Sequence, residues 1–389
     1  MRKDWEYKKL GEVCETSSGG TPSKTYTEYY ENGTIPWLRS GEVSQGYIYD
    51  AEIYISELGL NKSSAKIFPK GTVLIAMYGA TVGEVGILCN PMCTNQAICG
   101  VLPNDLYNSE FLRYVLLSHK DKYLSLAIGG AQPNISQQII KNTLIPLIDK
   151  STQLSIVAEL DKINELIQLK KQQLKDYDQL AQSIFYEMFG DPVENEKGWE
   201  VKKLGEICDI RDGTHDSPKY VEHSDYLLIT SKNIENNFIS FENVNYITEE
   251  DFLRINKRSK VDDGDIIMPM IGTIGNPIIV KLVNNINFAI KNVALIKFYS
   301  TSSVINYYLQ SLMKSSSFEK DITRFHKGGT QKFIALGTIR NFKIPLPPLP
   351  LQQQFAARIE AIERQKQQVS ETIKDLETLL ASRMQYWFD

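Results

Sequence analysis

The sequence has few of the groups that carry out enzyme chemistry. It contains no GxxxxGK[ST] motif, so it has no P-loop for a nucleotide. It also lacks an Asn/Asp-Pro-Pro-aromatic tetrad, which excludes the usual catalytic loop of an amino-methyltransferase. The 389 residues include only four His, whose positions show no metal-ligand spacing: His119, His215, His223 and His326. We therefore expect no catalytic residue and no metal site in this chain.

Long apolar runs are also missing. No stretch reaches the 18 or so apolar residues of a membrane span, and the opening MRKDWEYKKLG has no apolar signal core. We expect a cytoplasmic protein whose five cysteines stay reduced, with Cys14 and Cys208 at matching positions in strand-like stretches. The alternative is a zinc set whose spacing matches no standard finger, made of Cys89, Cys93, Cys99 and His119.

Glycine and proline are absent from a long internal stretch between Leu154 and Phe189. Nothing in it breaks a helix before Gly190-Asp191-Pro192. Its apolar residues recur every three or four positions, which predicts one helix about 50 Å long with a heptad seam. The seam consists of Ile156, Leu160, Ile163, Ile167, Lys170, Leu174, Tyr177, Ala181, Ile184 and Met188.

A second copy of this stretch follows 199 residues later and ends at Phe388. Two helices with one apolar stripe each are expected to pair, because neither stripe should stay in water. A buried polar residue within such a seam fixes the register. The second seam consists of Phe355, Ile359, Ile362, Lys366, Val369, Ile373, Leu376, Leu380, Arg383 and Trp387.

The repeat extends beyond the helices. The opening WEYKKLGEVC at Trp5 is matched by WEVKKLGEIC at Trp199. Gly19-Gly20-Thr21-Pro22 is aligned with Asp212-Gly213-Thr214-His215, and Gly-led apolar strands follow in both copies. Further strands are predicted at 94–98 and 290–294. One amphipathic helix per copy is predicted, at 109–126 and from 302 to 314 or beyond.

These elements predict an α+β fold in which two mostly-β domains alternate with two long helices in an internal repeat. The four segments are residues 1–146, 147–190, 191–345 and 346–389. The net charge of −4 argues against an indiscriminate nucleic-acid coat but allows local basic patches.

Polar loops that contain Gly interrupt both copies at equivalent places. Their amides and Arg can match base edges, and their Lys can neutralise phosphates, so they are the candidate DNA contacts, although each alone is also typical of a solvated loop. In the first copy these are Thr21, Ser23, Lys24, Arg39, Ser40, Tyr78, Asn95, Gln96, Gln132 and Asn134. In the second they are His215, Lys219, Ser231, Lys232, Asn233, Lys291, Asn292, Lys327, Thr330, Gln331 and Lys332.

Taken together, the motifs resemble the specificity subunit of type I restriction-modification systems. The resemblance covers the whole chain and rests on the two Trp-x-x-x-x-Leu-Gly-Glu openings and on four further motifs. These are Gly-Gly-Thr-Pro-Ser at 19–23, Gly-Thr-Val-Leu-Ile at 71–75, Asn-Gln-Ala-Ile at 95–98 and Ile-Pro-Leu-Pro-Pro-Leu-x-x-Gln-Gln at 344–353. The first copy of the last motif, at 145–150, lacks the double Pro.

The resemblance implies a non-catalytic reader of double-stranded DNA. Its two target recognition domains would each read half of a bipartite sequence, and its two antiparallel helices would act as a ruler. Modification subunits would carry S-adenosylmethionine and methylate adenine, and motor-nuclease subunits would use ATP and Mg. No cofactor is expected in this chain.

Two other functions are weighed against this one. A tandem-lobe interaction or scaffold protein that does not bind DNA would show no steep dependence of DNA binding on salt. A self-contained methyltransferase conflicts with the missing cofactor and catalytic motifs.

Overall fold

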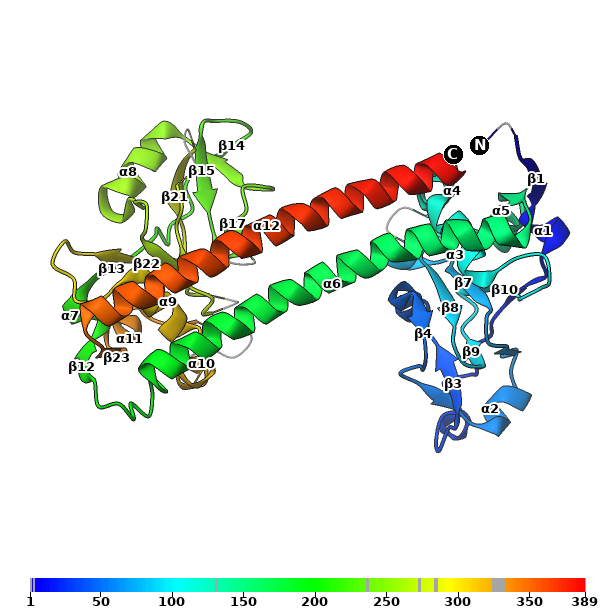
Figure 1. Cartoon of the computed structure of the whole chain (residues 1–389), viewed down its shortest axis with the longest axis horizontal. Helices are drawn as coiled ribbons and strands as arrows, with labels where there is room; N and C mark the ends of the chain where they lie inside the picture. The colour runs from blue at the N-terminus through cyan, green and yellow to red at the C-terminus, as the bar shows by residue number, and fades with distance from the viewer. Residues whose placement is uncertain are drawn as a thin grey trace. The chain divides into compact units, whose positions relative to one another are not determined.

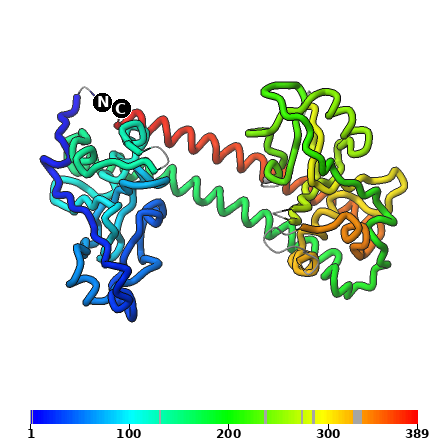
Figure 2. The backbone as a smooth tube through the Cα atoms, turned by 180° about the vertical axis from the view of Figure 1, so that it is seen from behind, coloured from blue at the N-terminus to red at the C-terminus, as the bar shows by residue number. Residues whose placement is uncertain are grey.

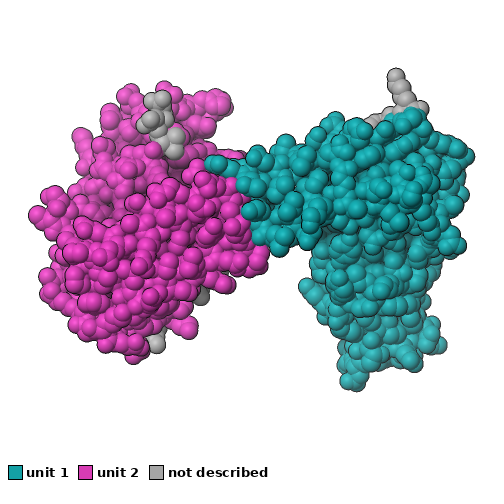
Figure 3. Space-filling model, viewed as in Figure 1, with its two compact units in different colours: residues 1–171, 371–389 teal, residues 172–370 magenta. Residues whose placement is uncertain are grey.

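The computed structural model describes residues 2, 4–129, 132–235, 238–271, 274–282, 286–323 and 333–388. The chain forms two compact units (Figure 3). Unit 1 contains residues 1–171 and 371–389, and unit 2 contains residues 172–370. The structure confirms the predicted mixture of helix and sheet and the internal repeat. The boundaries of the four predicted segments stay a prediction.

Two helices of 40 residues each dominate the chain, α6 (Lys150–Phe189) and α12 (Leu349–Phe388). They lie side by side in both views (Figures 1 and 2). In unit 1, Glu159 pairs with Arg383, and Lys171 Nζ lies 2.9 Å from Glu377 Oε1. These partners run in opposite order along the two helices, so the predicted antiparallel pairing is confirmed.

The N-terminal half of the α6 seam matches the prediction, and Ile156, Leu160, Ile163 and Ile167 are all buried. In the C-terminal half most of the predicted residues pack against the core of unit 2, but the most deeply buried residues lie one position later. Phe185 and Phe189 are buried there, while Ile184 and Met188 are only half-buried. The two Phe rings join an aromatic cluster in the core of unit 2, in which Phe189 lies 4.7 Å from Tyr308 and 5.2 Å from Phe355 between ring centroids. Burial against this core, rather than against α12 alone, decides which face of α6 turns inward.

Unit 1 contains two main sheets. One has the strand order β2 (Thr16–Ser18), β10 (Ile98–Val101), β7 (Val73–Ala76), β8 (Val85–Leu88), β4 (Tyr47–Ile48). The other has the order β5 (Tyr54–Ile55), β3 (Ile35–Leu38), β9 (Met92–Thr94), β6 (Ile67–Phe68) and lies away from α6 in Figure 1. A separate ladder pairs β1 (Glu6–Lys9) with β11 (Leu144–Leu147).

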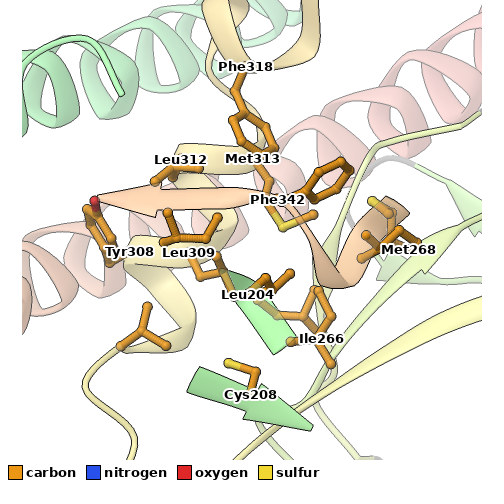
Figure 4. Close-up of a cluster of buried hydrophobic side chains, with 14 of the residues drawn as sticks. Leu204, Cys208, Ile266, Met268, Tyr308, Leu309, Leu312, Met313, Phe318 and Phe342 are labelled. Carbon is orange, nitrogen blue, oxygen red and sulfur yellow. The ribbon is translucent and has the colours of Figure 1, made fainter. Parts of the chain in front are cut away.

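Unit 2 repeats this plan. Its sheets have the orders β13 (Cys208–Asp212), β22 (Val293–Phe298), β19 (Ile266–Pro269), β20 (Ile278–Ile279) and β14 (Tyr220–Val221), β18 (Asn245–Ile247), β15 (Tyr226–Ile229), β21 (Asn287–Ile290). The ladder is β12 (Glu200–Lys203) with β23 (Lys343–Leu346), and a hairpin joins β16 (Ile234–Glu235) to β17 (Phe238–Ile239). Figure 4 shows the core, in which Leu204, Ile266 and Leu309 pack together.

The predicted single helix of each copy is two helices in the structure. In unit 1 these are α3 (Ser109–Ser118) and α4 (Lys120–Leu126), and in unit 2 α9 (Asn306–Met313) and α10 (Ser316–Thr323). Side chains at the breaks bond back to the preceding turn: Ser118 Oγ donates to the Val115 carbonyl, and Ser315 Oγ donates to the Leu312 carbonyl. Such bonds compete with continuation of the helix.

Shorter helices complete the two units. In unit 1 these are α1 (Leu10–Val13), α2 (Glu57–Asn61), α5 (Gln137–Lys141), η1 (Thr27–Tyr29), η2 (Ser40–Gln45) and η3 (Gly79–Thr81). In unit 2 they are α7 (Leu204–Ile207), α8 (Glu249–Ser259), α11 (Leu336–Arg340) and η4 (Ser231–Asn233). Within the described ranges, no helix is long and apolar enough to cross a bilayer.

The five cysteines are free thiols, and four of them are buried. The residues that the structure describes include no cluster of three or more His, Cys, Asp or Glu that could hold a metal ion. Cys89, Cys93, Cys99 and His119 are all described, so the alternative zinc set is not assembled.

Two equivalent glutamines connect the long helices to their units by hydrogen bonds. Gln153 near the start of α6 is fully buried: its Oε1 accepts from the Asn108 backbone N–H, and its Nε2 donates to the carbonyls of Leu106 and Ile148. Gln352 in α12 makes the same three bonds, with the Ile305 N–H and with the carbonyls of Ser303 and Pro347. Each glutamine thus ties the first turn of a long helix to the loop that precedes α3 or α9.

We predict that Gln352→Ala lowers the free energy of unfolding by about 1–3 kcal/mol, because it leaves buried backbone groups without a partner. Gln353→Ala, at the exposed next position, is the matched control and should change it by less than about 0.5 kcal/mol. Urea unfolding of the three proteins provides the measurement. Equal stabilities of the two variants would contradict the anchoring role of Gln352.

Candidate functional site

The chain passes several times between the two sheets of unit 1, and two of these crossings are neighbours. It leaves β2 of the first sheet for β3 of the second, and it returns from β9 to β10 through the turn Asn95–Ala97. Gly20 N–H donates to the carbonyl of Thr94 at 2.9 Å, which joins the two crossings. A Cβ on Gly19 would overlap the backbone of Thr94, so the close approach requires glycine there.

Unit 2 has the same two crossings, from β13 to β14 and from β21 to β22. Thr214 N–H donates to the carbonyl of Ile290 at 3.0 Å, and a Cβ on Gly213 would overlap that carbonyl. Gly213 is therefore the equivalent of Gly19, and the sequence alignment of Gly19 with Asp212 is wrong by one residue. The offset of 194 residues that relates Trp5 to Trp199 also relates Gly19 to Gly213, and the strands β2 and β13 end at equivalent positions, Ser18 and Asp212.

The residues around 94–98 and 290–294 were predicted to be strands, but each stretch is centred on a turn. Asn95 Oδ1 accepts from the Ala97 N–H at 3.2 Å, which closes a local turn. Asn292 has a φ of 56°, a left-handed conformation that Asn tolerates. The polar side chains are thereby exposed at a crossing instead of lying in a sheet.

Six predicted residues of unit 1 line one cavity of about 880 Å³ at this crossing. Its wall is held by two hydrogen bonds to the Gly-rich loop: Trp37 Nε1 donates to the Gly20 carbonyl at 2.8 Å, and Tyr30 Oη donates to the Pro22 carbonyl at 2.6 Å. The predicted residues that line the cavity are Thr21, Lys24, Arg39, Ser40, Asn95 and Gln96.

Two contacts fix polar groups at this cavity. Thr21 Oγ1 donates to Gln96 Oε1, which joins the two crossings through side chains. Arg39 is paired with Glu52 and lies 3.5 Å from the buried Glu42, so two carboxylates offset its charge. Sequence reasoning missed Glu52 because it is 13 positions from Arg39 and no local pattern joins the two residues.

The remaining predicted residues of unit 1 lie outside the lining of this cavity. Tyr78 forms an isolated β-bridge with Asn134, and Ile128 bridges the same Asn134, so Tyr78, Gln132 and Asn134 belong to a second exposed loop group. Ser23 is exposed in the Gly-rich loop, where its hydroxyl accepts from the Thr25 N–H.

In unit 2 the corresponding crossing carries His215. One ring nitrogen, Nε2, lies 2.8 Å from Asp212 Oδ2, and the other, Nδ1, lies 2.9 Å from Asn292 Oδ1. Asp212 is 6% exposed and also pairs with Arg258 of α8. Lys291 Nζ donates to Ser217 Oγ at 2.9 Å. Arg258 lies 46 positions from Asp212 in the sequence, and no motif marked it.

The other predicted residues of unit 2 have different surroundings. Asn233 is buried, and its Oδ1 accepts from the N–H and hydroxyl of Thr230, so it caps η4 and does not face outward. Ser231 and Lys232 lie in η4, half-exposed and exposed, and Lys219 is exposed. Four predicted residues lie outside the described residues: Lys327, Thr330, Gln331 and Lys332.

Comparison with known proteins gives the family. The model described as "Type I restriction modification DNA specificity domain" matches residues 2–176 and again residues 196–378, which together cover most of the chain. This chain belongs to the type I restriction-modification DNA specificity family.

Members of this family resemble the chain along most of its length. The MjaIX type I restriction enzyme specificity subunit of Methanocaldococcus jannaschii is 29% identical over 92% of this chain and 87% of its own. A chain from a structure on complex assembly and conformational transition of the type I R-M system has a TM-score of 0.59 at 20% identity, with 100% of this chain and 98% of that chain covered. The S subunit from M. genitalium has a TM-score of 0.52 at 14% identity, with 99% and 96% covered. These two structures confirm the fold.

Unit 2 contains another cavity, of about 1030 Å³. None of the residues predicted to contact DNA lines it. It lies among α6, α12, the residues around α9, and β20. Two lysines face it, Lys314 and Lys366. Burial acts to lower the pKa of Lys366, but Asp178 and Glu363, at 2.7 and 3.1 Å, raise it above its ordinary value. Lys366, the predicted polar seam residue, is thus half-buried and paired with two carboxylates, of which Asp178 is exposed and Glu363 is half-exposed.

For Lys314, the effects that lower the pKa outweigh those that raise it. Burial, together with the positive charge of Lys366, lowers the pKa of Lys314 from 10.5 to about 8. Below pH 8 the folded protein therefore carries an ammonium group that its surroundings disfavour. Between pH 8 and 10.5 the unfolded chain binds a proton at this position that the folded chain lacks, so this group makes the fold more stable as pH rises through that window.

We predict that Lys314→Met raises the free energy of unfolding at pH 7 by on the order of 1–3 kcal/mol. The difference from the unsubstituted chain should shrink as pH rises from 8 to 10.5, which urea unfolding at several pH values measures. Lys175→Met, at an exposed position of α6, is the control. A stabilisation that stayed constant across this window would show that the charge of Lys314 is not its cause.

Proposed function

We propose that this chain is the non-catalytic DNA-reading subunit of a type I restriction-modification complex. Each unit reads one half of a bipartite target in double-stranded DNA. The observation that carries this proposal is the repeated crossing, which has the same backbone hydrogen bonds in both units but different polar side chains. A shared frame with different side chains fits two readers of different base sequences.

The remaining roles follow from membership of the family and are part of the proposal. Modification subunits supply S-adenosylmethionine and methylate adenine, and motor-nuclease subunits supply ATP and Mg chemistry, in the cytoplasm. The paired helices α6 and α12 offer them a continuous surface. This chain supplies no catalytic residue and no cofactor. The scaffold alternative without DNA binding loses support, because the family model describes a DNA specificity domain.

The direct test exchanges residues 1–146 for the same segment of a relative with a known target. Expressed with its partner subunits, the hybrid should methylate sites in which one half of the sequence is new and the other half is unchanged. Long-read mapping of methylated adenines provides the measurement. If both halves change together, the units do not read independently, and if neither protein yields a bipartite site, the DNA-reading function itself is wrong.

The second test concerns the helices as a spacer. Each residue added to a helix moves its far end by about 1.5 Å and rotates it by about 100°. Because α6 and α12 are paired, the same insertion is needed after Gln173 and at the equivalent place after Thr372. Four residues in each helix add about 6 Å and little more than one turn, so the unspecified gap should lengthen by one or two base pairs of about 3.4 Å.

Two residues in each helix are the matched control, since they add about 3 Å but rotate the far end by about 200°. That variant should lose methylation because its reading surfaces no longer face the same duplex. Mapped methylation sites decide between the variants. An unchanged gap after the four-residue insertions would show that the helices do not set the spacing.

A further inference from the structure

The two crossings hold an amide side chain at the same place in each unit. Gln96 lies in the turn between β9 and β10, and Asn292 lies in the turn between β21 and β22. The frames around them agree in their hydrogen bonds. Asn95 N–H donates to the Leu38 carbonyl at 2.9 Å, and Lys291 N–H donates to the Ile229 carbonyl at 2.9 Å. The turn has three residues in unit 1 and two in unit 2. The two amides therefore lie in equivalent turns but not at strictly aligned sequence positions.

Each amide is bonded by the third residue after the opening strand of its unit. Thr21 follows β2 by three positions and donates to Gln96 Oε1. His215 follows β13 by three positions, and its Nδ1 lies 2.9 Å from Asn292 Oδ1. A second crossing therefore contacts each amide at its oxygen end, and the duplication presents this arrangement twice with different residues. His215 donates to Asn292 and to Asp212 together only when both ring nitrogens carry hydrogen.

We propose that Gln96 and Asn292 are the base-reading amides of the two units, with Thr21 and His215 as positioning residues. This inference rests on the proposed function and assigns that function to named atoms. The target edge is that of adenine in the major groove, which offers an N7 acceptor and an N6 donor that an amide matches with two bonds.

The chemistry of the amide supports this choice. A carboxamide has two donor hydrogens on nitrogen and two lone pairs on oxygen. The hydroxyl of Thr21 takes one lone pair of Gln96 Oε1, which leaves the other for the N6 donor and an N–H for N7. Because the hydroxyl donates to the oxygen end, the nitrogen end keeps both of its hydrogens for the base. An amide oriented in advance loses less entropy when it binds a base.

In unit 2 the orientation is set by a longer chain of contacts. Arg258 pairs with the buried Asp212, Asp212 holds the His215 ring at 2.8 Å, and the ring faces Asn292. Asn292 is half-exposed and Gln96 is exposed, so both amides are accessible to a duplex. Arg39 at the cavity wall of unit 1 is already paired with two carboxylates, which favours Gln96 over Arg39 as the reader.

The test uses the full chain expressed with its modification subunits and long-read mapping of methylated adenines. We expect Gln96→Ala to relax one base position in one half of the target. Asn292→Ala should relax one position in the other half. Selectivity at each relaxed position should fall by about 5- to 150-fold, the range for one bidentate base contact. Gln138→Ala removes an exposed amide on α5 and is the matched control, which should leave the target unchanged.

Gln96→Glu gives a sharper outcome. A carboxylate accepts hydrogen bonds but cannot donate to N7, so the preference at the same position should move from adenine to cytosine, whose N4 donates. If Gln96→Ala methylates no site at all, binding of the purified complex to four duplexes that differ at that position replaces the mapping. Unaltered selectivity in either assay would overturn the inference.

The positioning role has its own readout. Thr21→Val keeps the shape but removes the hydroxyl, and it should broaden the same base position as Gln96→Ala. Thr21→Ser should restore the original selectivity, because it restores the donor. A loss of thermal stability without a change at that position would show that Thr21 is only structural. An unsubstituted complex that yields no bipartite site would instead overturn the proposed function, and this inference with it.

Discussion

Burial of the apolar stripes of α6 and α12 is the constraint on which the rest of the structure depends. A stripe that runs along 40 residues cannot remain in water, and each helix covers part of the stripe of the other. Each unit completes its core with pieces of both helices. Ile156 and Phe388 join the core of unit 1, and Phe185 and Phe355 join the core of unit 2. The helices are therefore part of both cores and are not separate connectors.

The anchoring of these helices explains how the reading surfaces can vary. Gln153 and Gln352 make the same three buried hydrogen bonds, and the ladders β1–β11 and β12–β23 repeat the same antiparallel pairing. The crossings connect the sheets of each unit, and they involve neither the glutamine hydrogen bonds nor these ladders. Their backbone contacts depend on glycine at 19 and 213, while their side chains are free to differ between the units.

Sequence reasoning recovered what repetition and periodicity encode. The offset of 199 residues predicted both long helices and most of their seams, and the polar loops that contain Gly supplied six residues that line one cavity. It failed where a distant residue decides the outcome. Phe185 is buried because Tyr308 and Phe355 surround it, and Asn233 turns inward to cap η4. The turn at Asn95 was mistaken for a strand because apolar residues flank it on both sides.

The composition of unit 1 has a consequence for the order of folding. Its core includes residues from the range 371–389, among them Phe388, whose ring lies 5.8 Å from Phe111 between centroids, and Trp387, which stacks on Trp5. Unit 2 is continuous in sequence and can close as soon as it is synthesised. Unit 1 is begun first on the ribosome and finished last, so its apolar surface waits for the final turns of α12. During synthesis, unit 1 therefore exposes apolar surface for longer than unit 2, and such surface favours aggregation.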